Sequence, residues 1–343
     1  MRKIFVALAL GLLGPGGALA ADGCQGRNLL ADLPAAERRQ LDRAVADTPY
    51  ARGILWQARR GDQRITLVGT YHFDDPRHRA TLDRIVPRLA EAAALYVEAG
   101  PEEEARLTDA LRNDPSLMVE PAGPTLPERL TPAEWQTLSA AMADRGTPAV
   151  VAARMRPWYA AMLLGVSPCM IRSMNGDGEI AGLDRQLVTR AQAAGVPVRA
   201  LEPWDTIFGI FAGLTPEEEI AMIRAALPSA ALADDYAVTL ADSYFAGDVW
   251  RIWEFGRLEA LRNADLPKDQ IDRQMQLAQT RLMDNRNRAW IAPLLAGAEA
   301  AARDGRGIVA GFGALHLPGR NGVLALLAQQ GFTVTPLGAD PAY

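Results

Sequence analysis

The sequence lacks the features that usually mark nucleic-acid-binding and membrane-spanning proteins. It has no block of lysines and arginines and no basic stripe interleaved with aromatic residues, and its formal net charge is -5. Because nucleic-acid binding depends on neutralising phosphates, nucleic acid is excluded as a partner. Beyond residue 20 no apolar run approaches the roughly 18 residues that a membrane helix needs, so no transmembrane segment is expected in the mature chain. Repeats of solenoid period and low-complexity tracts are also missing.

The amino terminus carries the pattern of a cleavable secretory signal. Arg2-Lys3 precedes an apolar stretch over residues 4–13 that is too short to span a bilayer, and Ala18-Leu19-Ala20 has the form that signal peptidase cuts. The pattern predicts cleavage after Ala20. The mature chain, residues 21–343, is then expected in the periplasm or outside the cell.

Cysteine is scarce, and the two cysteines, Cys24 and Cys169, both belong to the mature chain. An oxidising compartment favours a disulfide between them. Two unpaired thiols are the alternative. A lipid anchor on Cys24 is less favoured, because Asp22-Gly23 makes a poor lipobox.

Strand-length apolar runs cluster towards the two ends of the mature chain, and helical spacing fills the regions between them. The pattern predicts an α/β (α+β) fold in which a sheet core, about residues 51–124, 176–214 and 305–343, carries large helical insertions, about 125–175 and 215–304. The expected strands are Ile54–Ala58, Ile65–Tyr71, Ala94–Glu98, Val196–Leu201, Gly307–Gly311 and Phe332–Leu337. Thr131-Pro132 and Thr215-Pro216 have the composition of helix starts.

Two of the three histidines end the same short motif. Gly69-Thr70-Tyr71-His72 and Gly313-Ala314-Leu315-His316 each follow an apolar run that reads as a buried strand. Each histidine therefore leaves the carboxyl end of a strand, where open α/β sheets bind ligands.

Carboxylates also stand at expected strand ends. Glu98 follows one apolar strand and Glu202 follows another, and both would project from the edge that carries the histidines if the strands are parallel. Each acid could instead favour the start of the helix that follows it. Arg286 lies in a polar cluster of an otherwise apolar helix, where it could point into a cleft or pair at the surface with Asp284 or Glu299.

The chain resembles the TraB/GumN family, whose animal relatives are the Tiki metalloproteases. The matching stretches occur in the family order across nearly the whole mature chain. They are Leu55-Trp56, Leu67–His72, Tyr96-Val97-Glu98, Gly182-Leu183-Asp184, Leu201-Glu202, Arg286-Asn287, Gly313–Gly319, Gly322-Val323-Leu324 and Leu327. The resemblance implies a fold similar to the erythromycin esterase and haem-binding ChaN group, with a central mixed sheet flanked by helices.

Carried over by position, the resemblance implies a functional set that comprises His72, Glu98, Arg286, Asn287 and His316, with Asp184 and Glu202 as outer residues. Two neutral imidazoles and a carboxylate suit Mn²⁺, Co²⁺, Zn²⁺ or Fe²⁺ with open positions for water. We therefore expect a metal site at His72, Glu98 and His316. A separation of the histidines beyond about 10 Å would exclude a shared ion.

This set of residues predicts an exported metal-dependent hydrolase that cleaves a peptide or another acyl bond. The metal would acidify a water and polarise a carbonyl, Arg286 would stabilise the oxyanion, and Asn287 would orient the substrate or a ligand. The sequence has no His-Glu-x-x-His motif, so an ordinary zincin is excluded.

Two other functions stay open at this stage. One is a metal-independent esterase in which His72 acts as general base and Glu98 orients it. The other is a non-catalytic binding protein that uses the same cleft for a peptide, a glycan or a haem-like ligand.

Overall fold

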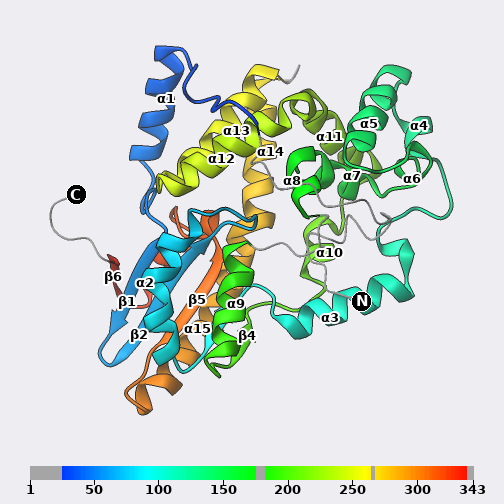
Figure 1. Cartoon of the computed structure of the whole chain (residues 1–343). Coiled ribbons are helices and arrows are strands. Elements are labelled where there is room, and N and C mark those ends of the chain that lie inside the picture. The colour runs from blue at the N-terminus through cyan, green and yellow to red at the C-terminus, as the bar shows by residue number, and fades with distance from the viewer. Residues whose placement is uncertain (1–24, 175–181, 264–266, 338–343) are drawn as a thin grey trace. The chain divides into compact units, whose positions relative to one another are not determined.

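The structure, a computed structural model, describes residues 25–174, 182–263 and 267–337 (Figure 1). The expected signal segment and Cys24 lie outside the described residues, so cleavage after Ala20 and the Cys24–Cys169 disulfide stay predictions. No helix in the described ranges is long and apolar enough to cross a membrane.

A single six-stranded mixed sheet forms the centre of the fold and contains all six expected strands. The strands are β1 (Leu55–Arg60), β2 (Gln63–Thr70), β3 (Leu95–Val97), β4 (Val198–Ala200), β5 (Ile308–Gly313) and β6 (Thr333–Pro336). Their order is β4-β3-β5-β2-β1-β6. The first four strands in this order are mutually parallel, whereas β1 is antiparallel to both β2 and β6.

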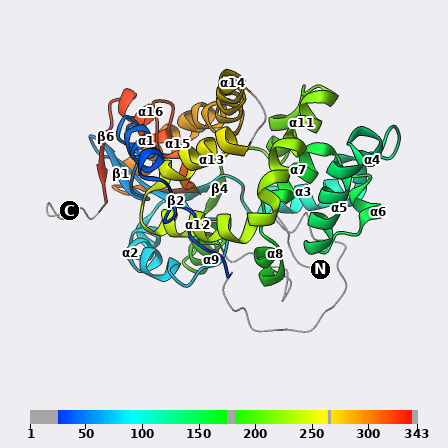
Figure 2. The same cartoon turned by 90° about the horizontal axis from the view of Figure 1, so that it is seen from above.

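The central strands are apolar because helices cover both of their faces. Ile65 and Leu67 of β2 pack on one face with Trp290 and Leu294 of α15 (Asn285–Arg303) and with α16 (Val323–Gln329). On the other face Val68 packs with α2 (His78–Glu91) and α9 (Leu183–Ala193). The two views agree on this layering, with β2 between the two helical layers (Figures 1 and 2). Residues that alternate along a strand thus enter two separate cores.

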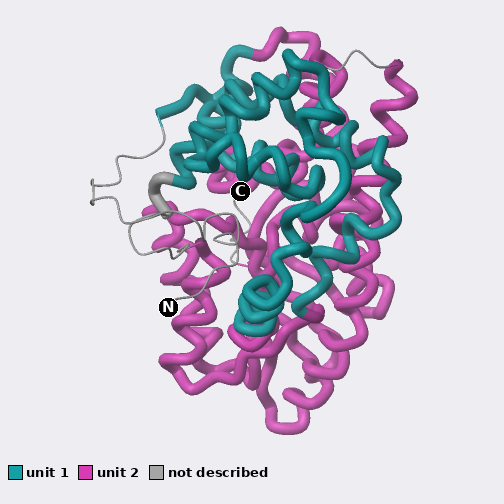
Figure 3. Tube along the Cα trace, turned by 90° about the vertical axis from the view of Figure 1, so that its right-hand side faces the viewer, with its two compact units in different colours: residues 1–32, 104–180, 204–240 teal, residues 33–103, 181–203, 241–343 magenta. Residues whose placement is uncertain are grey.

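Contacts divide the chain into two compact units, which Figure 3 distinguishes by colour. Unit 2 comprises residues 33–103, 181–203 and 241–343, and it holds the whole sheet. Besides the helices named above, it contains α1 (Ala35–Ala46), α13 (Val249–Asn263), α14 (Lys268–Gln279), the π-helix η4 (Thr280–Asp284) and the 3₁₀ turn η5 (Ala314–His316).

Unit 1 comprises residues 1–32, 104–180 and 204–240, and its described part is helical. Its elements are η2 (Pro115–Leu117), α4 (Leu126–Arg129), α5 (Pro132–Asp144), α6 (Ala149–Ala152), α7 (Pro157–Leu164), α8 (Pro168–Met174), α10 (Thr206–Phe211), α11 (Pro216–Ala226) and η3 (Leu227–Leu232). Two further helices, α3 (Pro101–Asn113) and α12 (Ala233–Phe245), contribute residues to both units.

The helix starts expected in unit 1 are confirmed. Thr131 and Thr215 each close a capping box with the glutamate three residues later, and proline occupies the first turn of both helices. Inside the unit, the guanidinium of Arg145 is buried and donates to four backbone carbonyls at the ends of α5 and α7. Such bonds satisfy carbonyls that a helix end leaves without partners.

Candidate active site

Sequence-predicted residues gather where the parallel strands of unit 2 end. Glu98 follows β3 directly, His72 lies two residues beyond β2, and His316 ends the η5 turn that follows β5. Because these strands run in the same direction, their carboxyl ends meet at one edge of the sheet.

The two histidines and Glu98 converge on the backbone of Gly313. A Cβ atom added to this glycine would lie 3.2 Å from Glu98 Oε1, 3.3 Å from His72 Nε2 and 3.6 Å from His316 Cδ2. His316 Nε2 is 3.9 Å from Glu98 Oε1. The rings are thus far closer together than the separation of about 10 Å that would exclude a shared ion.

Asp184 fixes the orientation of His72. His72 Nδ1 donates to Asp184 Oδ2 at 2.9 Å, and the hydroxyl of Thr70 donates to the other oxygen of this carboxylate. A carboxylate only accepts, so the proton lies on Nδ1 and Nε2 is the atom directed at the site. The negative charge of Asp184 is the main cause that raises the pKa of His72, to about 9. The site therefore favours positive charge at this ring.

The same arrangement recurs at His316, which is buried. The Nδ2 group of Asn287 donates to the backbone oxygen of Asn321 at 2.9 Å, so its Oδ1 accepts from His316 Nδ1 at 2.6 Å. Nε2 of His316 is again the atom that faces the site. Burial lowers the pKa of His316 to about 3, so this ring is neutral at physiological pH.

The side chain of Arg286 connects three groups of the site. Its guanidinium donates twice to Glu202, at 2.8 and 2.7 Å, and once to Glu98 Oε2 at 2.5 Å. Nη1 donates to the carbonyl of Leu282 at 3.1 Å and to His316 Nε2 at 3.2 Å. These five bonds use all five N–H groups of an arginine. Arg286 therefore does not pair with Asp284 or Glu299 at the surface.

Glu98 is held as a carboxylate by this network. Burial alone would raise its pKa, but the charge of Arg286 holds the pKa well below the usual range. The backbone N–H of Gly313 donates to Glu98 Oε1 at 2.7 Å. Burial instead raises the pKa of Glu202, which also accepts from the indole of Trp290 at 3.1 Å.

A π-helical turn precedes the residues that α15 contributes. The π-helix spans Thr280–Asp284, and Arg286 and Asn287 follow in the first turn of the α-helix. An extra residue in a helical turn changes the face on which later side chains lie, and such turns are frequent at functional sites. Arg286 and Asn287 therefore begin α15 in a helical phase that this turn shifts.

The donor set fits a transition metal in its chemistry, although it is not preformed in geometry. Both imidazoles direct Nε2 to the site and bind an oxygen acceptor through Nδ1, which is the usual outer arrangement of metal-ligating histidines. Among the described residues, however, no group of three or more His, Cys, Asp or Glu side chains is arranged to hold an ion as it stands. Nη1 of Arg286 lies against His316 Nε2, so it would have to withdraw when a metal binds there.

Several residues of the site were not among those predicted from sequence. Thr70, Trp290 and Asn321 hold Asp184, Glu202 and Asn287 respectively. Thr70 lies within the first histidine motif, and Trp290 stands four residues after Arg286 on one helix face. The sequence therefore contained a signal by which each of these two residues could have been assigned to the site.

The third histidine, His78, lies outside this network. It begins α2, is buried, and its Nε2 donates to the carbonyl of Phe73 at 2.8 Å. Its ring packs against Tyr71, Tyr244 and Phe245, which accounts for its burial.

Comparison with known proteins gives one match. A family model described as the TraB/PrgY/gumN family matches residues 54–336, a range that includes every residue of the site. No curated protein and no solved structure matches the chain.

Proposed function

The chain belongs to the TraB/PrgY/gumN family. From the geometry of its site we propose that it is a metal-dependent hydrolase of peptide or other acyl bonds, and from the pattern of its amino terminus that it is exported. We propose His72, Glu98 and His316 as the ligands of a divalent Mn, Co, Zn or Fe ion. When bound, such an ion supplies an acidified water and polarises a carbonyl.

One observation carries the proposal. Two imidazoles, held through Nδ1 by Asp184 and Asn287, both direct Nε2 at the space that Glu98 Oε1 also faces. A purely structural histidine satisfies its ring nitrogens with ordinary hydrogen-bond partners and does not require a second ring opposite it. The convergence of three donors in one small space is what a metal requires.

The surrounding residues keep the donors ready. Asp184 and Asn287 accept from Nδ1 of the two rings and so direct each Nε2 at the site. The neutral ring of His316 has its lone pair on Nε2, whereas a metal must displace the Nε2 proton that the raised pKa of His72 favours. Glu202 and Glu98 share the guanidinium of Arg286, so the carboxylate of Glu98 stays ionised and in place. Oε1 of Glu98 faces the shared space and serves as a ligand or as the acceptor of a proton from water.

Arg286 and Asn287 complete the proposed machinery. Arg286 can donate to a developing oxyanion only after one of its five N–H groups leaves its present partner. The Nη1 bond to His316 is the one that must open, because the lone pair of His316 Nε2 is needed for a ligand bond. We assign the released N–H group to the substrate carbonyl, where a fixed donor is most effective. Asn287 orients His316.

A metal-independent hydrolase is the second candidate, and the bond between His72 and Asp184 favours it. A histidine with an orienting carboxylate is the usual arrangement of a general base. In this structure the orienting group is Asp184, at 2.9 Å, rather than Glu98.

Hydrolysis assays on metal-free and reconstituted protein separate the two candidates. Mature protein would be freed of metal, dialysed, and assayed on fluorogenic peptides and esters with and without Mn²⁺, Co²⁺, Zn²⁺ or Fe²⁺. The proposal predicts activity only with metal, and loss of that activity in H316A. Full activity without metal that disappears in D184N would support the second candidate, and tight ligand binding without turnover would support a binding protein.

A further inference from the structure

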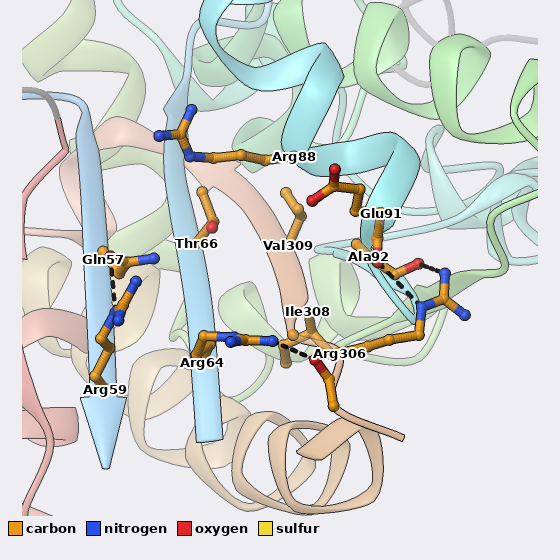
Figure 4. Close-up of a pocket in the computed structure, with 12 residues that line it drawn as sticks. Gln57, Arg59, Arg64, Thr66, Arg88, Glu91, Ala92, Arg306, Ile308 and Val309 are labelled. Atoms are coloured by element: carbon orange, nitrogen blue, oxygen red, sulfur yellow. Dashed lines mark hydrogen bonds between the residues drawn. The ribbon is translucent and has the colours of Figure 1, made fainter. Parts of the chain in front are cut away.

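Unit 2 has a concave surface at the opposite ends of β2 and β5 from the histidines. A hollow of about 590 Å³ opens beside the amino-terminal halves of β2 and β5 and the end of α2. The polar side chains that line it are mostly basic, and they include Arg59, Arg64, Arg88 and Arg306 with Gln57 and Thr66 (Figure 4). This volume lies within the range of small-molecule sites.

Two of these arginines lie directly opposite each other on neighbouring strands. Arg59 of β1 is the register partner of Arg64 of β2, and Gln57 is likewise opposite Thr66. Like charges at directly opposite positions destabilise a pair of strands. The repulsion is relieved if an anion lies between them.

The arginines have no carboxylate partner in the described part of the chain. Glu91 is the only acid in the lining, and its backbone oxygen, rather than its carboxylate, accepts a bond from Arg306. The hydrogen bonds that these arginines donate go to neutral oxygen atoms. Arg59 donates to the side-chain amide of Gln57, and the others donate to backbone carbonyls: Arg64 to that of Gly305, Arg88 to that of Arg84, and Arg306 to those of Glu91 and Ala92. These bonds order the side chains and leave most of their N–H donors available.

The gathering of four arginines in one hollow is unusual for this acidic chain and indicates an anion site. All but Lys3 and Lys268 of its basic residues are arginines, so the choice of arginine says little by itself. Elsewhere in unit 2 partly buried arginines pair with acids, as Arg251 does with Asp42 and Arg257 with Asp272. The hollow instead collects four arginines around one acid, Glu91, with which none of them forms an ion pair in the described part of the chain.

We propose that this hollow binds a phosphate-bearing anion, through the guanidinium groups of Arg59, Arg64 and Arg88, with Arg306 at its rim. Planar guanidinium forks match phosphate oxygens in pairs, and a single carboxylate group carries too little charge to balance the cluster. The ligand is a free phosphorylated small molecule or the phosphate of a lipid headgroup. The site is separate from the proposed hydrolytic site, which lies beyond the other ends of β2 and β5.

Pyrophosphate titration into metal-free mature protein tests the proposal. The double variant Arg59→Gln, Arg88→Gln removes two exposed charges. The hydrogen bonds given for these two arginines stay within their own strand or helix, so their loss should not separate elements of the fold. Arg39→Gln combined with Arg43→Gln on α1 makes the same charge change elsewhere in unit 2 and serves as the control. Calorimetry should show saturable binding to the wild type and the control, and binding to R59Q/R88Q weakened by about tenfold or more.

Thermal unfolding gives a second readout that does not depend on heats of binding. Without ligand, R59Q/R88Q should unfold at or above the wild-type temperature, because a like-charge pair has been removed. Saturating pyrophosphate should raise the unfolding temperature of the wild type and leave that of R59Q/R88Q unchanged.

Cosedimentation with vesicles identifies the source of the phosphate. Binding to phosphatidylglycerol vesicles but not to phosphatidylcholine vesicles, lost in R59Q/R88Q, assigns the site to a lipid headgroup. Pyrophosphate binding without vesicle binding assigns it to a soluble ligand. If both probes bind R59Q/R88Q as well as they bind R39Q/R43Q, or if neither binds the wild type, the proposal is overturned.

Discussion

Gly313 has no side chain, and this leaves room at the centre of the site. The position where its Cβ would lie is 3.2 Å from Glu98 Oε1 and 3.3 Å from His72 Nε2, closer than ordinary van der Waals contact. Gly69, the first residue of the other histidine motif, is confined differently, since its Cβ would lie 2.6 Å from Leu317 Cδ1. Each motif thus needs glycine because a side chain would clash there. At Gly313 the clash would be with the site residues, whereas at Gly69 it would be with Leu317.

Gly313→Ala is predicted to weaken metal binding while the protein still folds. The backbone of Gly313 has a φ of -46°, which alanine tolerates, so the added methyl group acts on the site rather than on the chain. Metal affinity measured by calorimetry should fall at least about tenfold, because the methyl group occupies space within the ligand sphere. Gly256→Ala on α13 is the control, since its Cβ would meet no atom within 4 Å. Unchanged metal affinity in G313A would mean that the ion, if present, lies elsewhere.

Arg286→Lys is predicted to separate catalysis from metal binding. A lysine keeps the positive charge beside Glu98, but it cannot join Glu98, Glu202 and His316 at once, because only the arginine fork has donors in these directions. We expect kcat to fall on the order of 100-fold with metal content retained. Arg288→Lys, an exposed neighbour on the same helix, should behave as the wild type. A loss of metal in R286K equal to that in H316A would show that Arg286 only supports the ligands.

At the scale of elements, capping boxes fix where the helices of unit 1 begin. Glu134 closes the box of α5 by accepting from the backbone of Thr131, and it also pairs with Arg224 of α11 at 2.7 Å. The hydrogen bond from Arg224 is the main cause that lowers the pKa of Glu134, to about 2. One carboxylate therefore caps a helix and links two helices of the unit.

The contribution of the Glu134 carboxylate to the free energy of unfolding should depend on pH. A lowered pKa in the folded state means that Glu134 stabilises the fold above its ordinary pKa of 4.5, and that this contribution is lost as the pH falls towards 2. Glu134→Gln keeps a capping acceptor but loses the charge, so it should be less stable than the wild type at pH 6 and equal to it near pH 2. Denaturant unfolding across this range measures the difference. Glu217→Gln, which removes an exposed acid from the first turn of α11, is the control for the loss of one charge.

The strands and the strand-end residues were predictable from sequence for a physical reason. A strand buried on both faces must be a continuous apolar run, and β2 and β5 are such runs. Parallel strands then bring their carboxyl ends together, so His72, Glu98 and His316 could be placed at one edge before the structure was known.

The contacts between site residues could not be predicted in the same way. Asp184 reaches His72 because Leu183 N donates to the carbonyl of Tyr71, a contact between distant segments that leaves no periodic signal. The direction of Arg286 depends on the π-helical turn before it, which alters the helical phase that a sequence pattern assumes.

At the scale of the whole molecule, every residue of the candidate site belongs to unit 2, and unit 1 is a helical unit with its own apolar core. The sheet of unit 2 carries the histidine site beyond one edge and the arginine-lined hollow at the other. The account therefore assigns hydrolysis and anion binding to opposite ends of the same strands.

Elemental analysis of mature protein produced in the periplasm tests the central claim most directly. The wild type should contain a transition metal in a fixed ratio to protein, H72A and H316A should both lose it, and His78→Gln should retain it because His78 lies outside the network. The three variants change the three histidines of the chain one at a time. A wild type that takes up none of Mn²⁺, Co²⁺, Zn²⁺ or Fe²⁺, or a metal content that survives in both H72A and H316A, would contradict the account.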